Sequence, residues 1–260
     1  MSEIRYELTD HVARVTIDRP RVLNALSRAA EDELREIWAR VESDRDVWVV
    51  VLTGAGERAF CVGADMSAQE TGETGIQYWA RERAGGFGGL AIRRTLNVPV
   101  IAAVNGHAVG GGLEMVLGCD IAVAVEEARF GLSEPRVGRI PLDGGVFQLV
   151  RQVPYRLAMS MLLTGQQISA AEACRYGLVN EVVARDGFLA AVQRWVDEVL
   201  RCAPLSLRAI KEMVLRTDAL RVEDATRMRF PSLIEALDSA DANEGVRAFR
   251  EKRKPIWRAS

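Results

Sequence analysis

An apolar strand followed by three consecutive glycines and a helix constrains the fold of this chain more than any other feature. Residues 98–104 read VPVIAAV, an apolar run typical of a strand that is buried on both faces. A glycine-rich turn, NGHAVGGG, follows at 105–112, and then come a predicted helix at 111–118 and a second strand, CDIAVAV, at 119–125. Strands that alternate with helices favour parallel pairing. The segment therefore predicts an α/β fold built from repeated ββα or βα units.

The stretches before this segment predict further strands and one long helix. Residues 3–17 alternate polar and apolar side chains across a Thr-Asp break, which predicts a hairpin. Ser27 is placed to cap a helix that extends through Val41, because apolar residues follow it at helical spacing. VWVVVLTG at 47–54 predicts another buried strand. Residues 67–89 are polar and spotted with glycine, and they predict no regular element.

The chain after residue 144 is almost wholly helical in pattern. The exceptions are a turn at 164–165 and a short strand near 178–183. We therefore expect an α/β core at 1–200 and a C-terminal helical region at 201–260. The apolar residues of this region include Phe230, Leu233, Ile234, Leu237, Val246 and Phe249. They are too many for a lone appendage, so the region is expected to pack on a neighbouring subunit or back on the core.

Charge and hydropathy exclude several classes of protein. Lys and Arg number 34 against 36 Asp and Glu, giving a net charge of −2, whereas a nucleic-acid-binding domain is usually clearly basic. The most apolar stretch, 98–119, is interrupted by Asn105, His107 and Glu114, which argues against a membrane span. Seven charged residues lie among the first twenty, so we expect no signal peptide.

The cysteine and histidine content argues against a metal site and against disulfides. The chain has four cysteines, widely scattered and without a CxxC pair, and only two histidines. Free cysteines are typical of a reducing compartment. We therefore expect a cytoplasmic protein, or one of an organelle matrix if the chain is a processed eukaryotic one.

Two glycine-bearing loops each follow a predicted buried strand. One is AFCVGAD at 59–65, and the other is the triple-glycine turn that ends in a helix. Glycines let a ligand approach the backbone closely, and the start of a helix offers unpaired N–H groups. Such groups bind phosphate, although the lysine of a P-loop is missing, or they hold an oxyanion. Two loops that offer two N–H groups to one carbonyl oxygen suit acyl chemistry on a thioester.

Two carboxylates stand close to these loops in sequence. Glu114 lies within the first turn of the helix that follows the glycines, and Glu134 lies in FGLSE at 130–134. A solvated surface charge is the usual role of a single glutamate. A pair of carboxylates that faces a reactive double bond supports acid–base catalysis instead, because one activates water while the other passes a proton to carbon.

Six motifs in this order resemble the enoyl-CoA hydratase/isomerase superfamily, the crotonase fold. They are RPRVLNAL at 19–26, AFCVGAD, NGHAVGGGLE, FGLSE, the LTG segment with GLV at 177–179, and the closing stretch from Glu244-Gly245 to Pro255. The resemblance covers nearly the whole chain. It implies a ClpP-like spiral of ββα units that is followed by a helical region which forms trimers.

The resemblance also implies roles for individual residues. The backbone N–H groups of Ala64 and Gly111 form the oxyanion hole, Glu134 exchanges the proton next to the thioester, and Glu114 positions and activates water. The presence of both acids favours reversible hydration of a 2-enoyl-CoA over isomerisation, dehalogenation or hydrolysis. No metal or redox cofactor is then needed, because conjugation with the thioester already activates the alkene, and coenzyme A is part of the substrate.

The same resemblance implies where coenzyme A binds and how the chain assembles. The expected contacts are Arg21, Val22, Leu23, Ala64, Asp65, Met66, Ser67 and Gly111. Lys252 and Arg253, in a basic stretch at 247–258, are expected near the CoA phosphates, often those bound to the next subunit. A homotrimer or a dimer of trimers follows. We expect no nucleic-acid or membrane partner.

One departure from the family pattern leaves several interpretations open. The usual IPGAGG run reads IPLDGG at 140–145, so Asp143 is a possible third acid beside the acyl pocket. It would serve as a nucleophile or base in a dehalogenase, hydrolase or isomerase, or recognise a cationic acyl group as in the crotonobetainyl-CoA hydratase branch. Alternatively it caps the helix that begins at Gly144. A CoA-binding or RNA-associated scaffold without activity is the non-enzyme alternative.

Overall fold

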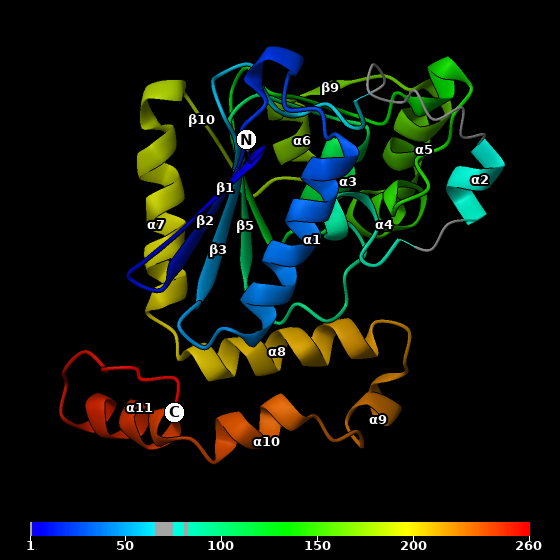
Figure 1. Cartoon of the computed structure of the whole chain (residues 1–260). Helices are drawn as coiled ribbons and strands as arrows, with labels where there is room; N and C mark the ends of the chain where they lie inside the picture. The colour runs from blue at the N-terminus through cyan, green and yellow to red at the C-terminus, as the bar shows by residue number, and fades with distance from the viewer. Residues whose placement is uncertain (1, 66–74, 81–82) are drawn as a thin grey trace.

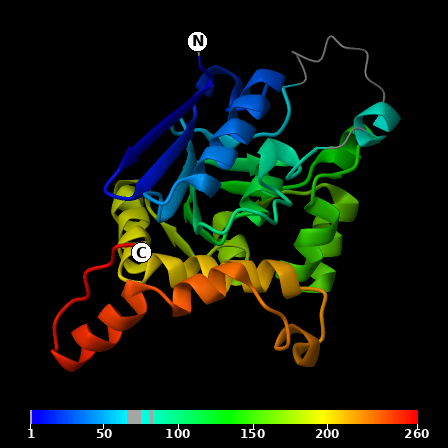
Figure 2. The ribbon, with the colours of Figure 1, turned by 60° about the horizontal axis from the view of Figure 1, so that its bottom comes forward.

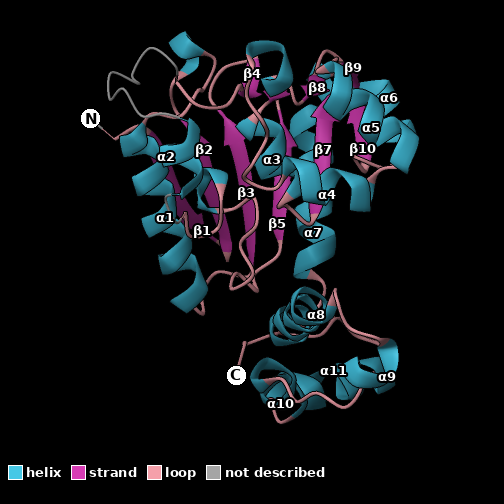
Figure 3. Cartoon of the chain, turned by 90° about the vertical axis from the view of Figure 1, so that its right-hand side faces the viewer, coloured by secondary structure: helices cyan, strands magenta, loops and turns pink. Residues whose placement is uncertain are grey.

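A mixed α/β core stands on a layer of C-terminal helices in this computed structural model (Figure 1). The structure describes residues 2–65, 75–80 and 83–260. Figure 3 shows the strands running side by side above the helical layer, which lies at the end of the core opposite to β4, β8 and β9. Among the described residues, no helix combines the length and apolar character that crossing a bilayer requires.

The larger sheet has six strands in the order β1-β2-β3-β5-β7-β10. Their bounds are β1 Ile4–Thr9, β2 Val12–Ile17, β3 Val49–Gly54, β5 Val100–Val104, β7 Ile121–Val125 and β10 Glu181–Val183. Only the β1–β2 hairpin is antiparallel, and the other neighbours pair in parallel. The predicted hairpin, buried strands and parallel pairing are therefore confirmed.

A second, smaller sheet lies beyond the ends of these strands, and the sequence analysis did not predict it. Its strands, in the order β4-β6-β8-β9, are β4 Ala59–Cys61, β6 His107–Val109, β8 Arg129–Gly131 and β9 Ile168–Ser169. We had expected loops at β4 and β6, which was wrong. Strands of two or three residues are too short to show an alternating pattern. Strands β4, β6 and β8 each follow a long strand, so β3-β4-α2, β5-β6-α3 and β7-β8-α4 form the repeated ββα units.

Helices cover both faces of the larger sheet. The helices of the core are α1 (Arg28–Ser43), α2 (Gly75–Ala80), α3 (Gly111–Leu117), α4 (Gly145–Gln152), α5 (Tyr155–Thr164), α6 (Ala170–Arg175) and α7 (Phe188–Leu200). The Ser27 hydroxyl accepts a hydrogen bond from Ala30 N at 3.1 Å, so the predicted N-cap of α1 is confirmed. Helix α7 contacts β3, β5 and β7 on one face, while α1 lies on the other (Figure 1).

The C-terminal helices form a separate layer with its own small apolar cluster. They are α8 (Pro204–Thr217), α9 (Val222–Ala225), α10 (Pro231–Leu237) and α11 (Ala240–Arg250). Helices α8 and α10 pack along each other, and α11 extends from the end of α10 (Figure 2). Leu205, Ala209 and Ala236 are buried between them, apart from the main core. Several large apolar side chains of this layer remain exposed.

Candidate active site

The two glycine-bearing loops meet at the start of α3. A Cβ atom added at Gly63 would lie 3.3 Å from Gly111 N and 3.5 Å from Val109 O, so the loop after β4 packs directly on the turn between β6 and α3. Gly110 has a φ of 58°, which favours glycine, and it turns the chain into the helix. Because Gly111 is the first helical residue, its N–H has no acceptor within the helix.

The N–H of Ala64 is also directed away from its neighbouring segment. Leu26 and Ala64 form a parallel bridge in which Leu26 N donates to Gly63 O and Asp65 N donates to Leu26 O. In a parallel bridge the N–H of the central residue points to the opposite side. The structure therefore brings Ala64 and Gly111 into adjoining segments, each with a backbone donor that the local secondary structure does not use.

The glycines beside this site are required by close packing. A Cβ at Gly111 would lie 2.5 Å from Cδ1 of the Phe87 ring, and a Cβ at Gly112 would lie 2.0 Å from the carbonyl oxygen of Cys61. Both distances are far below van der Waals contact. The triple glycine thus allows the start of α3 to approach β4 and Phe87 closely.

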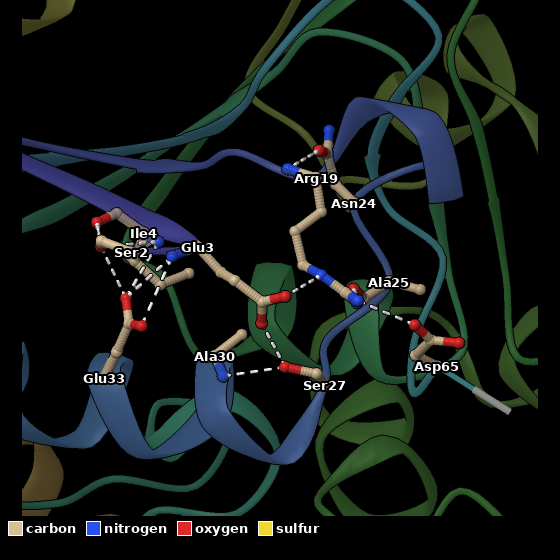
Figure 4. Close-up of polar contacts among 10 residues, drawn as sticks. All are labelled: Ser2, Glu3, Ile4, Arg19, Asn24, Ala25, Ser27, Ala30, Glu33 and Asp65. Carbon is tan, nitrogen blue, oxygen red and sulfur yellow. Dashed lines mark hydrogen bonds and ion pairs between the residues drawn. The ribbon is translucent and has the colours of Figure 1, made fainter. Parts of the chain in front are cut away.

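A half-buried arginine, Arg19, holds the loop that carries Ala64 (Figure 4). The guanidinium of Arg19 lies 2.8 Å from Glu3 Oε1 and 2.9 Å from Asp65 Oδ2, and it also donates to Ala25 O. Asp65 is 8% exposed, and the Arg19 side chain is 15% exposed. Because charged hydrogen bonds in a poorly hydrated site are strong, this cluster fixes the position of Asp65 and hence of the preceding Ala64. No role of Arg19 could be predicted from the sequence.

The segment expected to hold coenzyme A lies next to this loop. Arg21 and Val22 belong to the exposed 3-10 turn η1 (Pro20–Val22), and Leu23 follows it with a φ of 55°. Asn24 is fully buried, and its Nδ2 donates to Ala59 O at 2.7 Å and to Ala55 O at 3.0 Å. This side chain ties the turn to the start of β4. The expected contacts Met66 and Ser67 lie outside the described residues.

Glu114 points from the first turn of α3 into a buried site. It is 3% exposed, and its Oε1 accepts a hydrogen bond from Gly145 N at 2.8 Å. Burial raises the pKa of Glu114 to about 8, and the charges of Asp143 and Glu134 add to the rise. The backbone of Asp143 opposes this rise slightly by lowering the pKa of the carboxyl, as the Gly145 hydrogen bond also does. At neutral pH this carboxyl therefore retains a proton that an exposed glutamate would lose.

Glu134 approaches the same place from the other side of the glycine turn. It begins the 3-10 turn η4 (Glu134–Val137), and a Cβ at Gly110 would lie 3.0 Å from its Oε1. Its Oε2 is buried and has no hydrogen-bond partner within the described part of the chain. Burial raises the pKa of Glu134, and the charge of Asp143 adds to this. Two carboxyls of raised pKa thus flank the start of α3, an arrangement suited to acid–base chemistry.

Asp143 does not cap α4, so that expectation was wrong. The helix begins at Gly145, and its N-cap residue, Gly144, has a φ of 130° and no side-chain cap. The Asp143 carboxylate lies instead 2.5 Å from Nη1 of Arg83, whose Nη2 is 2.6 Å from Glu31 of α1. Arg83 comes from the glycine-spotted stretch that predicted no element, and no local pattern pointed to it.

Comparison with known proteins agrees with this geometry. The sequence profile of the enoyl-CoA hydratase/isomerase family matches residues 7–260. The chain belongs to this family. It is 38% identical to (E)-benzylidenesuccinyl-CoA hydratase of Thauera aromatica over 99% of both chains. It is also 37% identical to carnitinyl-CoA dehydratase of Proteus mirabilis over 95% of both chains.

Solved structures of the family share the whole architecture. An enoyl-CoA hydratase from Mycobacterium tuberculosis H37Rv is 30% identical, with a TM-score of 0.90 over the full length of both chains. One from Bacillus anthracis is 31% identical, also with a TM-score of 0.90 over the full length of both. The predicted crotonase fold is therefore confirmed.

Within one chain, the basic C-terminal residues lie far from the family's active-site loops. Figures 1 and 3 place α11 below α8, at the opposite end of the molecule from β4 and β9. Lys252 is exposed, and Arg253 is ion-paired to Glu244 at 2.5 Å and to Glu251 at 2.6 Å. A contact of Lys252 or Arg253 with coenzyme A stays a prediction.

The described residues also contain no group of three or more His, Cys, Asp or Glu side chains arranged to hold a metal ion.

Proposed function

We propose that this protein adds water reversibly across the double bond of a 2-enoyl-CoA thioester. The observation that carries the proposal is the pair of carboxyls beside the glycine turn that begins α3, of which Glu114 is buried and Glu134 is half-buried. The named activities of the relatives, a hydratase and a dehydratase of CoA thioesters, support this class of reaction.

Two backbone N–H groups would hold the thioester carbonyl. The candidates are those of Ala64 and Gly111, which come from adjoining loops and have no acceptor in the local secondary structure. As the alkene accepts water, negative charge grows on the carbonyl oxygen in an enolate-like intermediate. Fixed N–H donors stabilise that charge more than the neutral ground state. The start of α3 adds the positive end of a helix dipole.

Each of the two carboxyls would carry out one of the two proton transfers of the reaction. In hydration the ionised form of Glu114, a minority at neutral pH because its pKa is about 8, accepts a proton from water as the oxygen bonds to the β-carbon, and Glu134 donates its proton to the α-carbon. Dehydration reverses both steps. The reaction therefore needs a pair that carries one proton, and burial together with the charge of Asp143 favours this because both raise the pKa of each group. We propose that no further cofactor takes part, because conjugation with the thioester already activates the alkene.

The proposal identifies the acyl group of the substrate only by its chemical class. The relatives are named for benzylidenesuccinyl-CoA and carnitinyl-CoA, so substituted acyl groups stand beside simple ones. A panel of crotonyl-CoA, crotonobetainyl-CoA and (E)-benzylidenesuccinyl-CoA covers these cases. Loss of the enoyl-thioester absorbance reports hydration of each.

Substitution of Glu134 tests the mechanism. Glu134→Gln keeps the shape of the side chain but cannot exchange a proton, so we expect hydration to fall by about 10²–10⁴-fold on the best substrate of the panel. The matched control is Glu126→Gln at an exposed position after β7, which should leave the rate unchanged. A Glu134→Gln variant with normal turnover would contradict the mechanism.

A binding assay separates hydration from the non-enzyme alternative. Protein that binds coenzyme A but hydrates no member of the panel would overturn the proposal. In that case RNA binding that weakens steeply with salt would support a scaffold.

A further inference from the structure

A chain of buried ion pairs lies beside the two carboxyls of the site. The guanidinium of Arg83 joins Glu31, on α1, to Asp143, before α4, with N–O distances of 2.6 and 2.5 Å. The Arg83 side chain is 5% exposed, and both carboxylates are 11% exposed. Charges removed from water in this way are stable only when paired. The three side chains are therefore held in one arrangement.

Asp143 also reaches Glu114 through its backbone. The N–H of Gly145, two residues further on, donates to the Glu114 carboxyl at 2.8 Å, and the backbone of Asp143 lies near enough to lower the pKa of this carboxyl. The carbonyl oxygen of Asp143 packs closely on Gly86, where an added Cβ would lie at 2.8 Å. The loop at 143–145 is thus fixed to Arg83 by the Asp143 side chain, and its backbone holds the Glu114 carboxyl.

We propose that Asp143 is a positioning residue of the site, through which Glu31 and Arg83 fix the loop that orients Glu114 and place a fixed negative charge beside Glu114 and Glu134. The inference rests on the proposed hydration. It gives Asp143 no bond to the substrate, because its carboxylate is already engaged by a buried guanidinium. This role differs from that of a nucleophile and from that of a group that binds a cationic acyl chain.

The negative charge of Asp143 favours the protonated forms of Glu114 and Glu134. Like charges disfavour ionisation, and the Asp143 charge contributes to the raised pKa of both Glu114 and Glu134. The charged and titratable groups around this cluster are Glu31 and Arg35 from α1, Arg83, Glu114 from α3 and Glu134 from η4. Of the two cations, Arg83 is the one paired directly with Asp143.

If Asp143 acts in this way, its substitution should shift the pH profile of kcat rather than abolish turnover. Asp143→Asn keeps the backbone N–H and removes the charge, so both limbs of the kcat profile should move to lower pH by about one unit. Arg83→Gln should move them to higher pH, and Arg83→Lys should restore them. The matched control is Asp218→Asn, which breaks the surface pair with Arg94 and should leave the profile in place.

Three outcomes would overturn the proposal. They are a profile that does not move in Asp143→Asn, movement in the same direction in Arg83→Gln, and complete loss of turnover in folded Asp143→Asn. The last would point to a nucleophile.

A second readout does not depend on activity. The infrared band of protonated carboxyls is followed against pH, and its Glu114 component is assigned by its absence in Glu114→Gln. In Asp143→Asn this component should titrate at lower pH than in the wild type, and an unchanged titration would overturn the proposal. If the wild type hydrates no substrate while the titration shifts, the proposed function fails but the electrostatic role of Asp143 stands.

Discussion

At the scale of single residues, burial of Glu114 makes the stability of the protein depend on pH. The pKa of this carboxyl rises from an ordinary value of 4.5 to about 8. Between these values the folded protein holds a proton that the unfolded chain releases. The contribution of the protonated Glu114 carboxyl to the stability of the folded protein is therefore complete below about pH 4.5 and is lost as the pH rises towards 8.

Glu114→Gln tests this linkage, because glutamine resembles the protonated acid. Between pH 5 and 8 the unfolding free energy of the wild type should fall relative to that of the variant, by an amount on the order of a few kcal/mol. Urea unfolding at several pH values measures the difference. Parallel pH dependences of the two proteins would show that Glu114 ionises normally in the folded state.

At the scale of elements, the contact between α3 and β4 determines how the site is built. A Cβ at Gly112 would lie 2.0 Å from the Cys61 carbonyl oxygen, so Gly112→Ala must push the helix away from the strand. We expect a loss of about 1–3 kcal/mol in stability, measured by urea unfolding, together with reduced hydration. The control is Gly187→Ala, where an added Cβ meets nothing within 4 Å and φ is −86°. Equal effects of the two substitutions would refute the steric argument.

The elements also show what the sequence could predict. The long strands and α1 have enough residues for an apolar pattern, and Ser27 provides a local cap, so their positions followed from the sequence alone. The second sheet did not, because β4 and β6 each have three residues. Tertiary contacts define these strands: Asn105, just before β6, donates to Gly54 O and Gly56 O at 2.8 and 2.7 Å.

In the candidate site, too, some features could be predicted from the sequence and others could not. Glu114 and Glu134 lie in motifs that resemble the family, so the sequence alone singled them out. The Asp143 cap was wrong because a local pattern considers only neighbours in the chain, whereas the partner of this carboxylate, Arg83, lies 60 residues away. Arg19 was likewise visible in a motif, but its pairing with Asp65 depends on the packing of the loop after β4 against the start of the chain.

At the scale of the whole molecule, the helical layer exposes several large apolar side chains. Ile234, Leu237 and Phe249 are 58, 72 and 85% exposed on α10 and α11. Exposed apolar patches of this kind mark interfaces. A homotrimer or a dimer of trimers stays our prediction, and it would bring Lys252 and Arg253 of one copy towards the CoA site of another.

Phe249→Asp tests the assembly and the CoA contact together. A charge in the centre of an apolar interface should convert the assembly to smaller species, measured by multi-angle light scattering, whereas Phe249→Leu should keep it intact. If the basic residues act across the interface, dissociation should raise KM for the enoyl-CoA severalfold, because fewer cations then face its phosphates. A wild-type monomer would contradict the predicted assembly. A dissociated variant with unchanged KM would show instead that Lys252 and Arg253 contribute nothing to CoA binding.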